Sequence, residues 1–97
     1  MKVQFRQWKC EVKVAKYQTN NRTAIELVDA EDGEPVAMAS LNLPNEPMNK
    51  NEVAIKDYSE NEGMLRCLVR AEIVSEPLRI VQSGFVSIPI CKLLIRP

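Results

Sequence analysis

The sequence predicts an α+β domain, in which an antiparallel sheet of about five to six strands carries one α-helix on one face. Two observations support this fold class. Most of the first half of the chain alternates apolar and polar residues, which is the period of a half-buried strand. One segment, about residues 59–72, instead repeats its apolar residues at helical spacing. We expect the strands to begin as an N-terminal meander and residues 1–97 to form a single domain.

The first predicted hairpin joins the stretches CEVKVAKY and AIELVDA, which both alternate apolar and polar residues. Asn20 and Asn21 suit the tight turn between them, because asparagine tolerates the positive φ angle that such turns require. With these two residues as the loop, Val14 lies opposite Leu27 and the apolar sides of both strands coincide. This pairing also places the basic first strand beside the acidic second strand, so that their charges neutralise each other.

A second turn is predicted at EDGEP, where Gly33 supplies a positive φ angle and Pro35 marks the start of the strand VAMASLNL. Acidic side chains gather around this turn, which leaves a solvated turn and a calcium loop as interpretations. The solvated turn is favoured, because an EF-hand loop needs a glutamate at its twelfth position, whereas a proline and a strand follow here. The acidic residues of this turn are Asp29, Glu31, Asp32 and Glu34.

The second half of the chain is predicted to contain a loop, a short strand, the helix and two closing strands. PNEPMNKNE is the loop, since it is rich in proline and asparagine, and VAIKDY resumes as a strand. LRIVQSGFVSIPICKLLI has the pattern of two strands separated by a turn at Ser83 and Gly84. Pro89 lies inside the last strand and has no amide hydrogen to donate, so it indicates a strand edge or a bulge.

The stretch IKDYSENEGML carries three carboxylates at the start of the predicted helix. An acidic catalytic or metal-binding cluster is one interpretation, and helix capping is the other. Capping is favoured, because Ser59 and Glu62 fit the S-x-x-E capping box and because the helix dipole stabilises acidic groups in the first turn. Capping leaves Asp57 and Tyr58 unexplained. The candidate binding residues of this stretch are Asp57, Tyr58, Glu60 and Glu62.

The composition disfavours an enzyme. The chain has no histidine, which removes the commonest general base and the Ser-His and Cys-His nucleophile pairs. It also has no glycine-rich phosphate loop and no nucleophile elbow. Its three cysteines lack metal-ligand spacing and are interpreted as reduced thiols packed as small hydrophobes, with a disulfide or a redox-active Cys67 as the alternative. We therefore expect no catalytic residue, no metal and no cofactor. The cysteines are Cys10, Cys67 and Cys91.

The net charge is zero, but the charges are unevenly distributed. Residues 1–22 hold six basic groups and one acid, whereas residues 23–49 hold six acids and no base. No basic footprint extends along the whole chain, so direct nucleic-acid binding is disfavoured. No apolar run approaches the roughly 20 residues that cross a bilayer, and the first residues do not resemble a signal peptide. We therefore expect a cytoplasmic protein that has no membrane partner.

Three segments, residues 12–44, 55–65 and 83–93, together resemble the DUF4313 family. The shared features are the NN turn, EDGEP, NLP, KDYSENEG and SGF, in the order that the family shows. The family comprises small bacterial proteins that are commonly encoded on phages and other mobile elements of gut Firmicutes. The resemblance covers most of the chain and implies no catalytic residues.

The resemblance implies a small non-enzymatic protein that binds a host macromolecule on behalf of a mobile element. The leading hypothesis is an inhibitor of a bacterial defence system, such as an anti-CRISPR protein that binds a Cas effector stoichiometrically. The two acidic segments, at the EDGEP turn and at the helix start, are the expected contacts with a basic channel of the target. Two alternatives are a protein that sequesters a nucleotide signal with basic residues around the first strand, and a homodimeric accessory protein that pairs through an edge strand.

Overall fold

The fold consists of two antiparallel sheets and a short helix, as seen in a computed structural model that describes residues 1–96. The first sheet contains, in spatial order, β1 (Lys2–Phe5), β2 (Trp8–Lys16), β3 (Thr23–Asp29) and β4 (Pro35–Met38). The second contains β5 (Ser40–Leu41), β6 (Glu52–Ile55), β8 (Val86–Lys92) and β7 (Arg79–Ser83), again in spatial order. The predicted combination of antiparallel strands and a helix is confirmed, whereas the strands form two sheets of four rather than one of about five to six.

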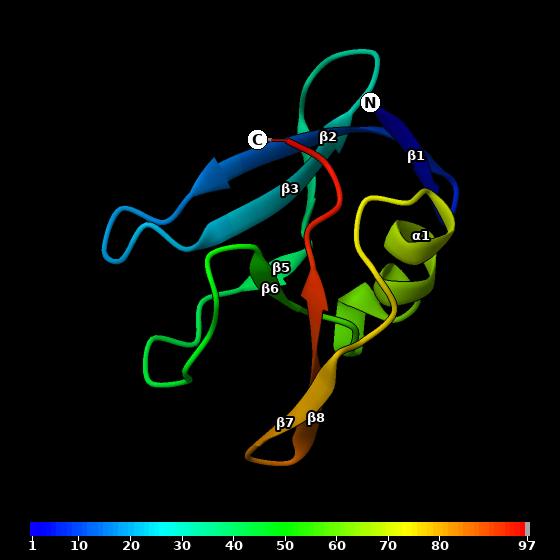
Figure 1. The fold of residues 1–97 in the computed structure, drawn as a ribbon. Helices are drawn as coiled ribbons and strands as arrows, with labels where there is room; N and C mark the ends of the chain where they lie inside the picture. Colours follow the sequence, from blue (N-terminus) through cyan, green and yellow to red (C-terminus); the bar gives the residue numbers. More distant parts are fainter. Residues whose placement is uncertain (97) are drawn as a thin grey trace.

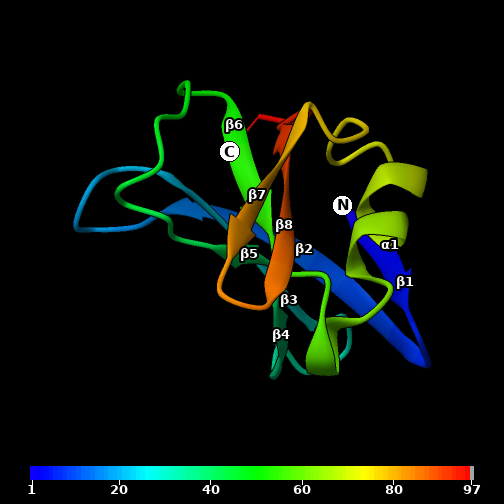
Figure 2. The ribbon, with the colours of Figure 1, turned by 90° about the horizontal axis from the view of Figure 1, so that it is seen from below.

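Strands of the second sheet run across those of the first, and the helix lies beside β1 (Figures 1 and 2). Crossed sheets of this kind are joined at corners where a strand passes from one sheet to the other. No helix in the described residues is long and apolar enough to cross a membrane.

The corner lies at Ala39, within the stretch VAMASLNL that the sequence predicts as one strand. The N–H of Ala39 donates to the C=O of Ile25 in β3 (2.8 Å), whereas its C=O accepts the N–H of Lys56, directly after β6 (2.9 Å). Ala39 is completely buried. One residue is thus hydrogen-bonded to both sheets, and the chain leaves the first sheet at β4 and enters the second at β5. The apolar alternation continues through the corner and gives no sign of it.

Ser40 supplies the hydrogen bond that the corner would otherwise lose. The C=O of Ala39 has turned to the second sheet, so the N–H of Ile25 needs another acceptor. The Oγ atom of Ser40 accepts it (2.9 Å) and also lies 2.9 Å from the hydroxyl of Tyr17. Ser40 is only 3 % exposed, so this hydroxyl replaces a backbone carbonyl inside the core.

The hairpin between β2 and β3 differs from the prediction by two residues. Val14 pairs with Ile25 instead of Leu27, and a hydrogen bond from the N–H of Tyr17 to the C=O of Arg22 (2.8 Å) closes a four-residue loop. A shift of two residues leaves every side chain on its predicted face, so burial cannot distinguish the two registers.

Contacts of the loop itself explain why it is longer. Asn21 has the predicted positive φ angle, 60°. The side-chain Nδ2 of Asn20 donates to Oδ1 of Asn42 (2.9 Å), which lies just after β5. The longer loop can therefore reach a segment that is distant in the sequence.

The predicted turns between β3 and β4 and between β7 and β8 are confirmed. Gly33 has a φ angle of 75° and β4 begins at Pro35, while Gly84 has a φ angle of 60° between β7 and β8. The pairing of β8 with β6 ends at Ala54 and Ile90, so Pro89 lies in the half of β8 that has only β7 as a partner. This local edge agrees with the expectation for a proline in a strand.

The predicted helix over residues 59–72 is shorter than expected. A 3-10 turn, η1 (Ser59–Asn61), precedes the α-helix α1 (Met64–Arg70). Ser59 and Gly63 have φ angles of 55° and 96°, which an α-helix excludes, and Glu72 ends the segment with a φ angle of 60°. Positive φ angles at both ends therefore confine the helix to two turns.

The core has two parts. The larger lies between the two sheets and α1, and the smaller lies on the opposite face of the second sheet. All three cysteines are free; Cys10 and Cys91 are buried and Cys67 is half-buried. Burial raises the pKa of the Cys91 thiol to about 11. The largest completely buried residues of the larger part include Ile25, Leu27, Ile55, Met64, Leu68 and Ile73, and the smaller part contains Ala54, Ile88 and Ile90.

Ser40→Ala is expected to lower the free energy of unfolding by about 1–3 kcal/mol, because it leaves the buried N–H of Ile25 without an acceptor. Tyr17→Phe is the matched comparison: it removes the hydroxyl beside Ser40 but keeps the bond to Ile25, and it should cost about 0.5–1.5 kcal/mol. Urea unfolding of both variants measures the difference. Equal losses in the two variants would contradict the role of Ser40 as the acceptor for β3.

Candidate interaction surfaces

Asp57 caps the helix, which accounts for the residue that the sequence pattern left unexplained. Its Oδ1 atom accepts the backbone N–H of Leu65, the second residue of α1 (2.8 Å). Ser59 makes no capping hydrogen bond with its side chain, and neither η1 nor α1 has a side-chain cap at the residue that precedes it. The predicted capping box of Ser59 and Glu62 is therefore wrong. The positive φ angle of Gly63 delays the start of α1, so one free N–H of its first turn, that of Leu65, bonds to Asp57 instead.

Asn61 anchors the same stretch to both sheets. It is 1 % exposed, and its Nδ2 donates to the C=O of Met38 (2.6 Å) and to the C=O of Lys56 (3.1 Å). The sequence offers no signal for this role, because an asparagine within an acidic run is typical of an exposed turn.

Glu60 and Tyr58 are both held by Lys56. The Nζ atom of Lys56 forms an ion pair with Glu60 and lies 5.6 Å from the centre of the Tyr58 ring. The hydrogen bond between Lys56 and Glu60 lowers the pKa of the Glu60 carboxyl and raises the pKa of Lys56. Tyr58 is half-buried and packs against the smaller core cluster. Among the acidic residues of this stretch, only Glu62 has a carboxylate without a hydrogen bond or ion pair in the described part of the chain.

The turn between β3 and β4 is shaped by its own aspartates. Oδ1 of Asp29 accepts the N–H of Glu31 (2.8 Å), and Oδ1 of Asp32 accepts the N–H of Glu34 (3.0 Å). The backbone closes the turn as well, since the N–H of Asp29 donates to the C=O of Glu34 (2.7 Å) and that of Gly33 to the C=O of Asp29 (2.9 Å). Two carboxylates thus fix the turn, and two exposed glutamates remain available to solvent.

The two acidic segments do not form one surface. In Figure 1 the turn between β3 and β4 lies at the top, whereas the beginning of α1 lies at the lower right. Within residues 1–96, no three His, Cys, Asp or Glu side chains come together in a way that could hold a metal ion. The candidate residues therefore divide into an acidic turn, comprising Asp29, Glu31, Asp32 and Glu34, and a helix start, comprising Asp57, Tyr58, Glu60 and Glu62.

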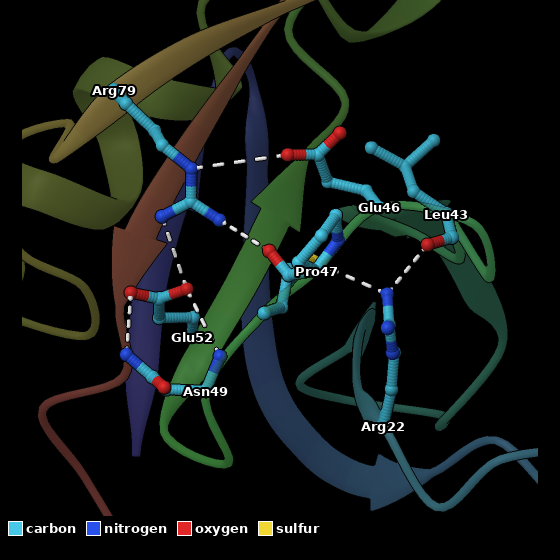
Figure 3. Close-up of polar contacts among 8 residues, drawn as sticks. Arg22, Leu43, Glu46, Pro47, Asn49, Glu52 and Arg79 are labelled. Carbon is cyan, nitrogen blue, oxygen red and sulfur yellow. Dashed lines mark hydrogen bonds and ion pairs between the residues drawn. The ribbon is translucent and has the colours of Figure 1, made fainter.

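An ion pair between half-exposed Arg79 and buried Glu52, which the sequence did not predict, holds the loop between β5 and β6 (Figure 3). Nη1 of Arg79 donates to Oε1 of Glu52 (3.1 Å), and Nη2 donates to the C=O of Pro47 (2.8 Å). The N–H of Asn49 also donates to Oε1 of Glu52 (3.1 Å). Glu52 is 7 % exposed, and these bonds, first that of Asn49 and then those of Arg79, lower the pKa of its carboxyl.

Arg22 holds the same loop from the β2–β3 hairpin. Its Nη1 atom donates to the C=O of Leu43 and lies 3.4 Å from Sδ of Met48 (Figure 3). Between the hairpin and the loop is a hollow of about 540 Å³. Its lining comprises three cations, three amides, the carboxylate of Glu52 and the thioether of Met48; the cations and amides are Lys16, Arg22, Lys50, Asn20, Asn21 and Asn49.

No protein-family model, curated protein or solved structure gives a significant match to the chain. The resemblance to the DUF4313 family therefore stays a prediction.

Asp57→Ala is expected to lower the free energy of unfolding by about 0.5–2 kcal/mol, because the N–H of Leu65 loses its cap. Ser59→Ala should change stability by less than about 0.5 kcal/mol, since Ser59 makes no capping bond. Thermal or urea unfolding compares the two variants. A larger loss of unfolding free energy for Ser59→Ala than for Asp57→Ala would instead support the capping box.

Glu52→Gln is expected to destabilise the protein most near neutral pH. A carboxyl whose pKa is lowered by folding stabilises the native state above its unfolded pKa, about 4.3, and this contribution is lost as the pH falls through the lower folded value. The difference in unfolding free energy between wild type and Glu52→Gln should therefore shrink as the pH is lowered below about 4. Glu72→Gln, which removes a charge at an exposed position, is the matched control. A pH-independent difference would contradict the ion pair and hydrogen bonds of Glu52 as the cause.

Proposed function

We propose that the chain is a non-enzymatic binding protein that inhibits a bacterial defence system by stoichiometric contact with a host protein. The observation that carries this proposal is the acidic turn, whose shape is fixed by two of its carboxylates while Glu31 and Glu34 stay exposed. Such a turn is suited to contact with a positively charged protein surface.

The rigidity of the acidic turn supports its use as a contact. Its ends are tied together by the bond between Asp29 and Glu34, and the N–H of Ala30 donates to the C=O of Lys9 in β2 (2.9 Å). A loop that is already ordered loses less conformational entropy when it binds. The glutamates are therefore presented on a fixed backbone rather than on a mobile loop.

The helix start contributes less to the proposed contact. The carboxylates of Asp57 and Glu60 already bind Leu65 and Lys56, so contact with a partner would compete with bonds that hold the fold. Glu62 is exposed, and it is the residue of this segment best suited to a secondary contact.

The class of partner follows from the resemblance to a family carried on mobile elements. A protein that blocks host defence has to occupy a functional surface of its target, and the nucleic-acid channels of defence nucleases, Cas effectors included, are basic. The net charge of zero indicates a local acidic contact rather than mimicry of a whole nucleic acid.

The test is a plaque assay in bacteria whose defence system restricts a phage. The wild-type protein should restore plaque formation, and Glu31→Lys combined with Glu34→Lys should reduce that effect by about tenfold or more, because attraction becomes repulsion. Glu72→Lys combined with Glu76→Lys changes the same charge at exposed positions outside both acidic segments and should behave as wild type. Failure against a panel of defence systems would refute the inhibitor, and equal activity of the two double variants would exclude the acidic turn as the contact.

The hollow beside Arg22 favours a second candidate, a protein that sequesters a nucleotide signal. Its volume falls within the usual range of ligand pockets, about 300–1,000 Å³, and Lys16 and Lys50 could pair with phosphate groups. Melting the protein with and without cyclic nucleotides separates the candidates. A rise in Tm that Lys16→Glu combined with Lys50→Glu removes would support sequestration.

A further inference from the structure

Strand β7 forms an uncovered edge of the second sheet. It pairs with β8 on one side and with no strand of residues 1–96 on the other. The β7–β8 hairpin extends away from the rest of the molecule, with its turn at the bottom of Figure 1. The loop between β5 and β6 contacts Arg79 through Glu46 and Pro47, but no strand of the described residues pairs with the outer edge of β7.

Pro89 determines which backbone groups of β7 face the open side. Ile80 pairs with Pro89 across the ladder, and Pro89 has no N–H to donate. The pair is therefore of the non-hydrogen-bonded kind, in which the flanking residues make the ladder bonds. It follows that the N–H and C=O groups of Ile80 point away from β8, and by alternation those of Gln82 do the same.

The side chains along this edge are apolar and exposed. Ile80 is 57 % exposed, Leu78 before the strand is 53 % exposed, and Phe85 in the turn is fully exposed. Natural edge strands are commonly protected by a charged residue or a proline. The one charged residue of β7, Arg79, is instead directed to Glu52 in the interior.

We propose that β7 pairs in antiparallel fashion with β7 of a second copy, which joins two second sheets into one continuous sheet across a two-fold axis. In the register that we propose, the outward groups of Ile80 in each copy form a hydrogen-bonded pair with those of Gln82 in the other. Val81 lies on the two-fold axis and faces Val81 of the second copy.

A second copy fits this edge because the edge is self-complementary. Antiparallel pairing brings the Phe85 end of each strand to the Leu78 end of the other. Because the contact is symmetric, the same exposed apolar residues of both copies are covered. Arg79 comes opposite Ser83, and no charge meets its like. One strand pair is small compared with stable interfaces of about 1,200–2,000 Å², so we expect a dimer that forms in the micromolar range.

Sedimentation at increasing concentration tests the pairing. The mass of the wild type should rise from 11.0 kDa towards twice that value. Ile80→Lys should remain monomeric, because a charge on the edge opposes pairing. Leu94→Lys replaces an equally exposed apolar residue (49 %) outside the hairpin and should dimerise as wild type. A wild type that stays monomeric at every concentration, or an Ile80→Lys variant that dimerises normally, would overturn the proposal. The edge of β7 would then be available for pairing with a strand of another protein.

Disulfide trapping tests the register. Val81→Cys should form a covalent dimer under mild oxidation, because the two copies of residue 81 face each other across the axis. Ser83→Cys, which faces Arg79 of the other copy, should not. Trapping through residue 83 alone would overturn this register. Melting each variant under reducing conditions shows that it remains folded.

Discussion

The passage of the chain between the two sheets at Ala39 and Ser40 is the constraint on which the remaining packing depends. One residue makes both the hydrogen bond to β3 and the hydrogen bond next to β6, so the two sheets are tied together at this point. Ala39 is completely buried at this point, and a larger side chain would overpack the space between the sheets. The hydroxyl of Ser40 allows the crossing, since it replaces the carbonyl that Ala39 has turned to the second sheet. The core between the sheets and α1 therefore closes around a corner of two small residues.

Local features of the fold could be predicted because they depend on few neighbouring residues. Gly33 and Gly84 take the positive φ angles of their turns, and Pro89 lies where β8 lacks one partner. The corner at Ala39 and the register of the first hairpin could not be predicted, because in both cases the alternatives bury the same side chains. The observed arrangement is selected by hydrogen bonds between distant segments, such as the one from Asn20 to Asn42. The helix is shorter than the sequence predicts, because apolar spacing carries no information about backbone φ angles.

The acidic residues of the candidate surfaces also show what the sequence does not determine. Their positions in the sequence identify where carboxylates gather, but not which of them the fold uses. Asp29, Asp32 and Asp57 bind backbone N–H groups, and their short side chains are suited to such local bonds. Glutamates of the acidic turn stay exposed instead. The Arg79–Glu52 pair could not be predicted, because it joins residues 27 positions apart, in β6 and β7, that only the strand order of the second sheet brings close.

The acidic turn separates the residues that determine its shape from the residues that it displays. Asp29, Asp32 and Gly33 hold the backbone through bonds within the turn, and the side chains of Glu31 and Glu34 make none of these bonds. A lineage that carries this scaffold can therefore vary the two displayed positions while stability is maintained. A surface whose displayed side chains do not hold its backbone is favourable for adaptation to a partner that itself changes. Each new side chain is then presented by a backbone of unchanged conformation.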